Sequence, residues 1–377
     1  MHTSVSRTAL LATAALALGA LAGTPAAASH AAPSAQTALA EQPLARTLLD
    51  PDGNRVVVDD DLPAGETPDA LSRPSFARAA AVAAAKAPKA KKKLKTLVIP
   101  VYWSGAGKDT SNAKVKKRIK ATMKTADTYF RTVSAGRIGH ATTVLGWQKI
   151  PRPAVSCGIM SQADHVGRHG SSRAKAAGKN PAKFDRVIFY VTAKACDGYS
   201  GVAGLGSMPG RYVWLEGNLA PNVMIHELGH NLGLDHSRYT VCSTKTGKRL
   251  IFGTTKQCAD VEYGDMTDVM GNNPDAGWFG APKLARLGWF SGKNLAKNTS
   301  TKKKTYTLRP LAAATSKAKA VRVKGTSGRY YWVEYRKRTG LDSLLSPGLE
   351  GVQIRLGKPS SYLGESAVLD MLPAPYT

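Results

Sequence analysis

The sequence predicts a mixed α/β (α+β) protein, in which a mixed β-sheet with one histidine-bearing helix precedes a smaller β-rich region. Between about residues 96 and 292, strand-like runs alternate with helical patterns. Over residues 300–377, short runs of branched and aromatic residues are separated by glycines. Within the first region, the stretch HELGHNLGLDH at 226–236 contains three of the eight histidines of the chain.

Residues 1–28 have the three parts of a secretory signal peptide. Arg7 supplies positive charge, residues 9–22 form a short apolar core, and small residues precede a cleavage site after about Ala28, with Ala32 as an alternative. The apolar core is too short for a comfortable membrane span, and no other stretch approaches that length. We therefore expect a secreted, extracellular protein without a transmembrane anchor.

Residues 29–95 form a segment of unusual composition before the first predicted strand. Residues 29–70 are net acidic, whereas residues 71–95 are net basic and rich in alanine. Because aromatic and large aliphatic side chains are few, this segment can form little hydrophobic core. Two interpretations follow: a disordered linker, or a pro-segment that is removed near the lysine cluster at its end.

The elements of the region 96–292 follow from the spacing of apolar residues. Strands are predicted at 96–103, 140–150 and 185–193 and within the glycine-rich stretch 201–218. One helix is predicted over 111–134, with one apolar face formed by Val115, Ile119, Met123, Ala126 and Phe130. A second helix, from about Pro221 to Leu232, carries most of the histidine motif.

The tail has four strand-like runs, at 305–311, 318–325, 329–338 and 348–357. The sequence ends soon after an apolar run, so we expect either an incomplete last sheet or a truncated sequence. The aromatic residues of the third run can form either a carbohydrate-binding face or the core of a small β module, and core packing is the commoner use.

The four cysteines form an even set in a chain that we expect to be exported, which favours disulfides. Three pairings are possible, and Cys157–Cys196 with Cys242–Cys258 is favoured because each pair closes a local loop. No CxxC spacing is present, which argues against a structural zinc knuckle.

The net charge of +27 does not predict a specific nucleic-acid site. The lysines are dispersed through KVKKRIK, TKKKTY and YRKR without interleaved aromatic residues, which is typical of a basic solvated surface. This charge is compatible with electrostatic attraction to anionic cell-wall polymers. The sequence carries no signal for an oligomeric state.

The histidine motif has the spacing of a catalytic metal site. On a helix, His226 and His230 stand on the same face and can bind one metal ion, while Glu227 is rotated away and can contact a metal-bound water. Gly233 can end the helix in a left-handed conformation and turn the chain, so that His236 becomes a third ligand. Three imidazoles with an open fourth position suit a catalytic zinc ion.

This motif resembles the HExxHxxGxxH signature of the metzincin zinc endopeptidases. The stretch EYGDMTDVMG at 262–271 resembles their Met-turn, with Met270 a better match than Met266. The residues of this stretch and its spacing from His236, together with the stretches at 129–147 and 281–290, are most similar to the gametolysin-like peptidases. The similarity covers about residues 96–292 and extends only weakly into the tail.

The resemblance implies a cleft crossed by the active-site helix, with a mixed sheet above it. It implies that the three histidines bind zinc, that Glu227 is the general base and that Met270 packs beneath the ligands. A tyrosine used by some members two residues after this methionine is replaced here by Asn272. Latency through a pro-segment cysteine does not apply because no cysteine precedes Cys157, which leaves a carboxylate of the segment 50–70 as the alternative.

Other polar residues have ordinary structural explanations. We expect His140, His165 and His169 to be surface or loop histidines. Three aspartates near the Met-turn are candidates for binding calcium: Asp265, Asp268 and Asp275. Such residues more often cap helices and form hydrogen bonds within turns.

The expected function is a secreted zinc metalloendopeptidase that hydrolyses extracellular or cell-wall proteins or glycoproteins by Glu-assisted attack of zinc-bound water. Two alternatives stay open. One is an exported binding or adhesion protein that uses the same scaffold without catalysis. The other is a zinc hydrolase of a non-peptide amide.

Overall fold

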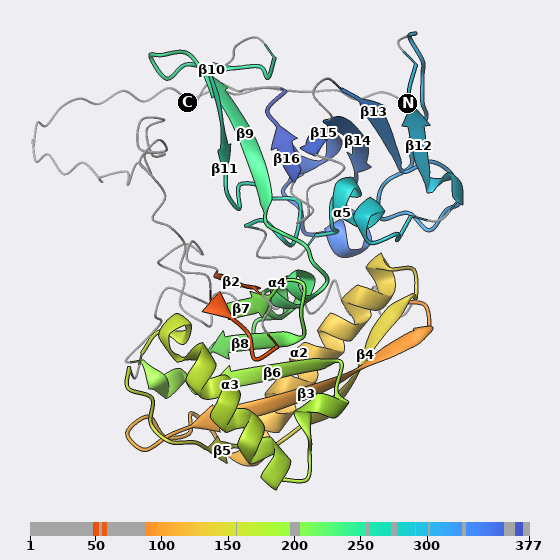
Figure 1. The fold of residues 1–377 in the computed structure, drawn as a ribbon. Helices are drawn as coiled ribbons and strands as arrows, with labels where there is room; N and C mark the ends of the chain where they lie inside the picture. The colour runs from red at the N-terminus through yellow and green to blue at the C-terminus, as the bar shows by residue number, and fades with distance from the viewer. Residues whose placement is uncertain are drawn as a thin grey trace, which may run out of the picture. The chain divides into compact units, whose positions relative to one another are not determined.

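The computed structural model is a mixed α/β protein built on two mixed β-sheets, as the sequence predicts (Figure 1). The structure describes residues 48–52, 55–58, 87–155, 157–196, 204–253, 257–272, 277–290, 292–300, 302–325, 329–357 and 366–371. The predicted signal peptide lies outside the described residues. Contacts within the chain divide it into Met1–Ala40 and Glu41–Thr377, and every described residue belongs to the second unit.

The first sheet has the strand order β1-β2-β7-β8-β6-β3-β4, with β5 paired to β3. Its strands are β1 (Leu48–Leu49), β2 (Arg55–Val58), β3 (Lys92–Tyr102), β4 (Ile138–Val144), β5 (Gln148–Lys149), β6 (Arg186–Val191), β7 (Gly204–Ser207) and β8 (Tyr212–Glu216). The centre of the sheet is parallel, whereas β7 runs antiparallel to both β8 and β2. The sheet therefore ends in an antiparallel edge.

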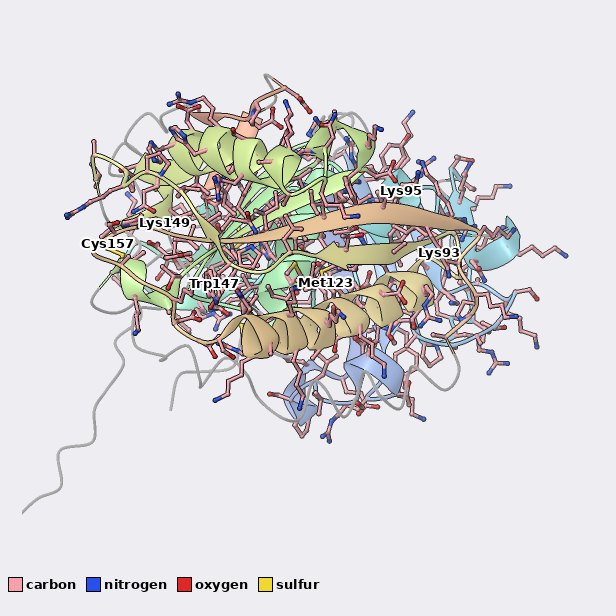
Figure 2. All side chains as sticks on the ribbon, turned by 90° about the horizontal axis from the view of Figure 1, so that it is seen from below. Lys93, Lys95, Met123, Trp147, Lys149 and Cys157 are labelled. Atoms are coloured by element: carbon pink, nitrogen blue, oxygen red, sulfur yellow. A yellow bond between two sulfur atoms is a disulfide. The ribbon has the colours of Figure 1, made fainter. Side chains whose placement is uncertain are left out.

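Helices cover both faces of this sheet. Helix α2 (Asn112–Val133) and helix α4 (Pro221–Asn231) pack on one face, and helix α3 (Ile159–Ala176) packs on the other. Figure 2 shows Met123 and Trp147 between α2 and the strands. The apolar face predicted for α2 is the buried one, since all five of its predicted residues are at most 1% exposed.

The central strands alternate between these two cores. Val98 and Ile188 face α2 and α4, whereas their neighbours Leu97 and Val187 face α3. Such two-sided burial explains the near-continuous apolar runs at 96–103 and 185–193, because a covered parallel sheet has no solvated face. The sequence did not predict α3, whose buried face includes several small residues.

The second sheet has the order β10-β9-β16-β15-β14-β13-β12, with β11 paired to β9. Its strands are β9 (Ser237–Ser243), β10 (Arg249–Leu250), β11 (Cys258–Val261), β12 (Leu295–Asn298), β13 (Ala320–Lys324), β14 (Tyr330–Arg336), β15 (Gly351–Gly357) and β16 (Ser366–Leu369). Strands from both sides of the predicted boundary at 292–300 thus share one sheet. Helix α5 (Ala281–Arg286) packs against β14.

Three predicted features of the two sheets can be compared with the structure: the first strand of the tail, the aromatic residues of the tail and the strand at 140–150. The run 305–311 does not form a strand, because Pro310 has no N–H to donate, although Leu311 N–H still donates to Tyr335 O at 2.8 Å. Trp332 packs in a small core with Ala281 and Ala320, which is the core-packing alternative. The single strand predicted at 140–150 is divided into β4 and β5.

The segment before residue 96 contributes to the first sheet. Strands β1 and β2 form an antiparallel hairpin, and β2 pairs with β7. Strand β3 begins at Lys92, four residues before the predicted start. Part of the segment that the sequence assigns to a linker or pro-segment is therefore ordered on the sheet.

Both favoured disulfides are present, Cys157–Cys196 and Cys242–Cys258. The second joins directly paired residues of β9 and β11, in the strand that follows His236. Among the described residues, no helix combines the length and the apolar character needed to cross a membrane.

Candidate metal centre

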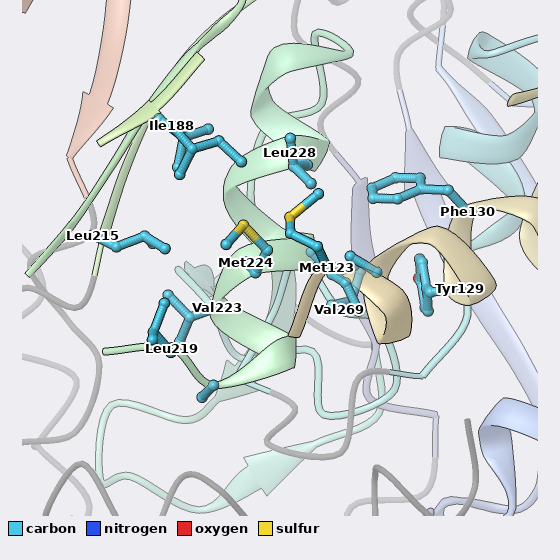
Figure 3. Close-up of a cluster of buried hydrophobic side chains, with 14 of the residues drawn as sticks. Met123, Tyr129, Phe130, Ile188, Leu215, Leu219, Val223, Met224, Leu228 and Val269 are labelled. Atoms are coloured by element: carbon cyan, nitrogen blue, oxygen red, sulfur yellow. The ribbon is translucent and has the colours of Figure 1, made fainter. Parts of the chain in front are cut away.

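The histidine-bearing helix α4 is buried along its length. Pro221 occupies its first turn, where a missing N–H costs nothing, and the side chain of Asn218 accepts the N–H of Ala220 at 2.8 Å. Val223, Met224 and Leu228 pack against α2 and the sheet (Figure 3). The remaining faces carry the polar residues of the motif.

Helix α4 ends at Asn231, and Gly233 forms the turn after it, as the sequence predicts. Gly233 has φ = +80°, a conformation that L side chains rarely adopt. Its N–H donates to His230 O at 2.7 Å, and the N–H of Leu234 donates to Gly229 O at 3.2 Å. These two bonds close a helix-terminating turn, which sends the chain back past the helix through His236 and into β9.

The three predicted ligands lie together. His226, His230 and His236 each offer a ligand atom, and these atoms lie within 4.8 Å of one another. The centroids of the three rings are separated by 4.8, 5.0 and 5.4 Å, and no ring is more than 7% exposed. The group can therefore hold one metal ion.

Each imidazole is oriented by an oxygen at Nδ1. His226 Nδ1 lies 2.8 Å from Val269 O, and His230 Nδ1 lies 2.8 Å from Leu234 O. His236 Nδ1 lies 2.7 Å from the Oε1 atom of Glu262. A proton on each Nδ1 satisfies these oxygens, so Nε2 is the nitrogen with a lone pair to present to a metal ion. The donor set and its outer contacts thus fit a metal that prefers imidazole.

The side chain of Glu227, on α4, lies against β7. It is fully buried, and a β-carbon on Gly204 would lie 2.5 Å from its Oε1 atom. A β-carbon on Gly206 would lie 2.7 Å from Glu227 O and 2.9 Å from His230 Cβ. Glycines in β7 therefore let the strand backbone pass directly over the glutamate and the second histidine.

Met270 packs against helix α4. It is fully buried, and a β-carbon on Gly229 would overlap its Sδ atom. Its carbonyl accepts the N–H of Ser237 at 2.7 Å. Met266, the weaker match, is 43% exposed.

The acidic residues around Met270 form turn and ion-pair contacts. Asp268 accepts the N–H groups of Met270 at 2.9 Å and Gly280 at 2.6 Å. Asp265 accepts the N–H of Thr267 and forms an ion pair with Arg355 of β15. Burial alone would raise the pKa of Asp265, but the Arg355 charge and the hydrogen bonds from Thr267 lower it. Asp275, the third calcium candidate, lies outside the described residues.

The other three histidines that the structure describes do not join the group. The expectation of a surface position is wrong for His140, which is buried in β4 with Nδ1 2.9 Å from the hydroxyl of Thr96. Burial lowers the pKa of His140 to about 3. His165 and His169 are half-buried neighbours on α3.

Sequence reasoning missed three residues that contact the site from other elements. Glu262 holds His236, and the ring of Tyr263 lies 3.9 Å from the His236 ring, centroid to centroid. Arg355 holds the turn that contains Met270. Tyr263 has φ = +57°, so the chain bends sharply between Glu262 and the Met-turn. In the sequence, the tripeptide Tyr-Gly-Asp at 263–265 was noted only as part of the resemblance to a Met-turn. It did not predict these side-chain contacts.

No family model and no curated protein matches this chain in comparisons with known proteins.

Proposed function

We propose that this protein is a secreted zinc-dependent endopeptidase that acts on extracellular or cell-wall proteins. The observation that carries the proposal is the convergence of His226, His230 and His236, each oriented through Nδ1, together with a buried glutamate, Glu227, on the helix that carries two of them. Three neutral imidazoles with an open fourth position are the ligand set of hydrolytic zinc sites. The two disulfides agree with an oxidising, extracellular address.

Zinc, when bound, lowers the pKa of water and polarises the carbonyl that is attacked. The protein supplies the proton transfers. Glu227 follows His226 by one residue, so it projects beside the ligands rather than among them. It accepts a proton from the attacking water as the new C–O bond forms, and it passes this proton to the leaving nitrogen as the C–N bond breaks.

The three oxygens at Nδ1 favour a proton on Nδ1 of each imidazole, which leaves Nε2 to bind metal. The oxygen of Glu262 acts on His236 in this way, and main-chain oxygens act on the other two rings. Such partners fix the direction of each ligand and typically change metal affinity 10–100-fold, about 1.4–2.8 kcal/mol, when they are removed.

The test compares wild-type protein with Glu227→Gln, a variant of almost the same shape that cannot act as a base. Both are incubated with a peptide mixture, before and after metal removal and zinc addition, and products are identified by mass spectrometry. We expect both proteins to bind one zinc ion and only the zinc-loaded wild type to cleave, with a loss in the variant of about 10²–10⁴-fold.

Equal cleavage by Glu227→Gln would refute the mechanism. Zinc binding with hydrolysis of small amides but not of peptides would favour the non-peptide amidase. Zinc binding without any hydrolysis, also after removal of the N-terminal segment by limited proteolysis, would favour the binding or adhesion protein.

A further inference from the structure

Helix α3 carries a second pair of histidines, on the face of the first sheet opposite α4. His165 and His169 are four residues apart, so they stand on the same side of the helix. Their ring centroids are 4.3 Å apart, closer than the 4.8 Å between the rings of His226 and His230, which have the same spacing on α4. Both rings of the pair are half-buried, so solvent reaches them. The pair therefore has the spacing of a two-histidine metal site and is open to ions from solution.

A main-chain oxygen orients the first ring of the pair. His165 Nε2 lies 2.8 Å from Pro151 O, in the segment that follows β5. A carbonyl oxygen can only accept a hydrogen bond, so Nε2 of the neutral ring carries the proton and Nδ1 carries the lone pair. Imidazoles that bind metal typically donate their other ring N–H in this way. His226 and His230 make the same kind of contact with main-chain oxygens, although through the opposite nitrogen.

The charges around the pair also suit a bound cation. Partial removal from water, together with the charges of His165 and Arg168, lowers the pKa of His169, and the charge of Asp164 only partly opposes this. His169 is therefore neutral at pH 7, as a metal ligand must be. Arg168 lies between the two histidines in sequence, but Asp164 pairs with it at 2.8 Å and offsets its charge.

We propose that His165 and His169 form a second, weaker site for a divalent transition-metal ion on the surface of α3. Imidazole ligands select ions such as Zn²⁺, Cu²⁺ and Ni²⁺, whereas Ca²⁺ and Mg²⁺ prefer oxygen. Among the described residues, no third metal-binding side chain joins the pair, so water completes the coordination of the ion. With two protein ligands instead of three, this site fills only after the group at His226, His230 and His236. The bound ion links two successive turns of α3. The inference does not rest on the proposed function, because the pair lies on the other face of the sheet from Glu227.

The test counts zinc ions bound to the full-length protein. Protein loaded with one equivalent of zinc is dialysed against increasing concentrations of free Zn²⁺, and the bound metal is measured by atomic emission. His165→Gln and His169→Gln each remove one ring of the pair and keep a polar residue with good helix propensity. Lys175→Gln, at an exposed position of the same helix, is the matched control.

A second measurement reports on the individual rings. Diethyl pyrocarbonate modifies accessible neutral imidazoles, and peptide mapping by mass spectrometry gives the extent of modification at His165 and at His169. Each protein is treated with and without zinc beyond the first equivalent. This readout does not depend on catalysis.

We expect the wild type and Lys175→Gln to bind two zinc ions per chain, the second at the higher free zinc concentration. Each histidine variant should bind only one. In the wild type, zinc beyond the first equivalent should protect both rings of the pair from modification. A second ion retained by His169→Gln, or rings that stay equally reactive at every zinc concentration, would overturn the inference. If His165→Gln does not fold, His169→Gln decides the question, because it leaves the contact between His165 and Pro151 in place.

This site and the proposed endopeptidase fail in different ways. Glu227→Gln should still bind both ions, and His169→Gln should hydrolyse peptides as the wild type does. One bound ion in the wild type, with hydrolysis intact, would overturn the second site and leave the endopeptidase standing. Loss of the second ion in His169→Gln, without hydrolysis by any protein, would support the second site and refute the endopeptidase.

Discussion

Met270 Sδ occupies the space in which a β-carbon on Gly229 would lie. The methionine therefore packs directly against the backbone of α4, one residue before His230. Because Met270 also accepts the N–H of Ser237, which follows His236, this one residue is in contact with both segments that carry the ligands. The glycine of the motif and the methionine of the later turn thus form one packing unit.

This contact predicts that Gly229→Ala is destabilising, although alanine is the better helix former by about 1 kcal/mol. The overlap with Met270 should lower the free energy of unfolding by about 1–3 kcal/mol, measured by urea denaturation, and should also weaken zinc binding. The matched control is Gly167→Ala in α3, where the nearest atom to the new β-carbon is 3.5 Å away. A loss of stability in the control equal to that in Gly229→Ala would contradict the packing argument.

The contact between His236 and Glu262 leads to a prediction about metal affinity. Glu262→Ala should weaken zinc binding about 10–100-fold, because His236 loses the carboxylate that orients it and stabilises the proton on Nδ1. The measurement is a competition titration with a chromophoric chelator. Glu350→Ala, at an exposed position, is the control and should bind zinc as the wild type does. Unchanged affinity in Glu262→Ala would exclude an orienting role.

The ligand group was predictable because its information is local. The four-residue spacing of His226 and His230 places them on the same face of a helix. Gly233 predicts the turn that brings His236 back towards them. Both operate within eleven residues. The α2 face was predictable for the same reason, since its apolar residues repeat with the helical period.

The rest depends on contacts between distant segments, which no periodic pattern encodes. Glu262 reaches His236 from 26 residues further along the chain, and β2 reaches β7 from about 150 residues away. From the sequence, the glycines of β7 were predicted to form a turn. In the structure, they let the backbone of β7 approach Glu227 closely. Strand β9 joins the tail in one sheet because β16 pairs with it in parallel, which the separate strand runs could not reveal.

A buried ion pair links the tail to the Met-turn. Arg355 of β15 is fully buried between Asp265 and Glu334. Burial opposes its charge, but these two carboxylates and Asp268 outweigh burial and raise the pKa of Arg355. The tail therefore neutralises the acidic residues of the turn that supports the ligands.

We expect Arg355→Met to lower the free energy of unfolding by about 3–5 kcal/mol, since it leaves buried carboxylates without their counter-charge. Arg168→Met is the control for the loss of an arginine, because the pair of Arg168 with Asp164 is 63% and 65% exposed, and it should cost at most about 1 kcal/mol. Urea denaturation measures both. Similar costs in the two variants would show that the tail is not required for the Met-turn.

The buried imidazole of His140 predicts a specific loss of stability in acid. Its pKa of about 3 in the folded protein lies below the ordinary value of 6.5, so the unfolded chain binds a proton first as the pH falls. The contribution of His140 is therefore complete above pH 6.5 and decreases towards pH 3, by up to about 1.4 kcal/mol for each pH unit. His140→Asn keeps a polar atom near Thr96 but cannot titrate. It should be less stable than the wild type at pH 7, because it loses the ring packed against Phe130. This difference in the free energy of unfolding should shrink steadily between pH 6.5 and 4.5.

Urea denaturation across this pH range measures the change, with His165→Asn, at a half-buried position of α3, as the control. A difference between His140→Asn and wild type that stays constant with pH would show that the buried ring is not the source of the acid sensitivity.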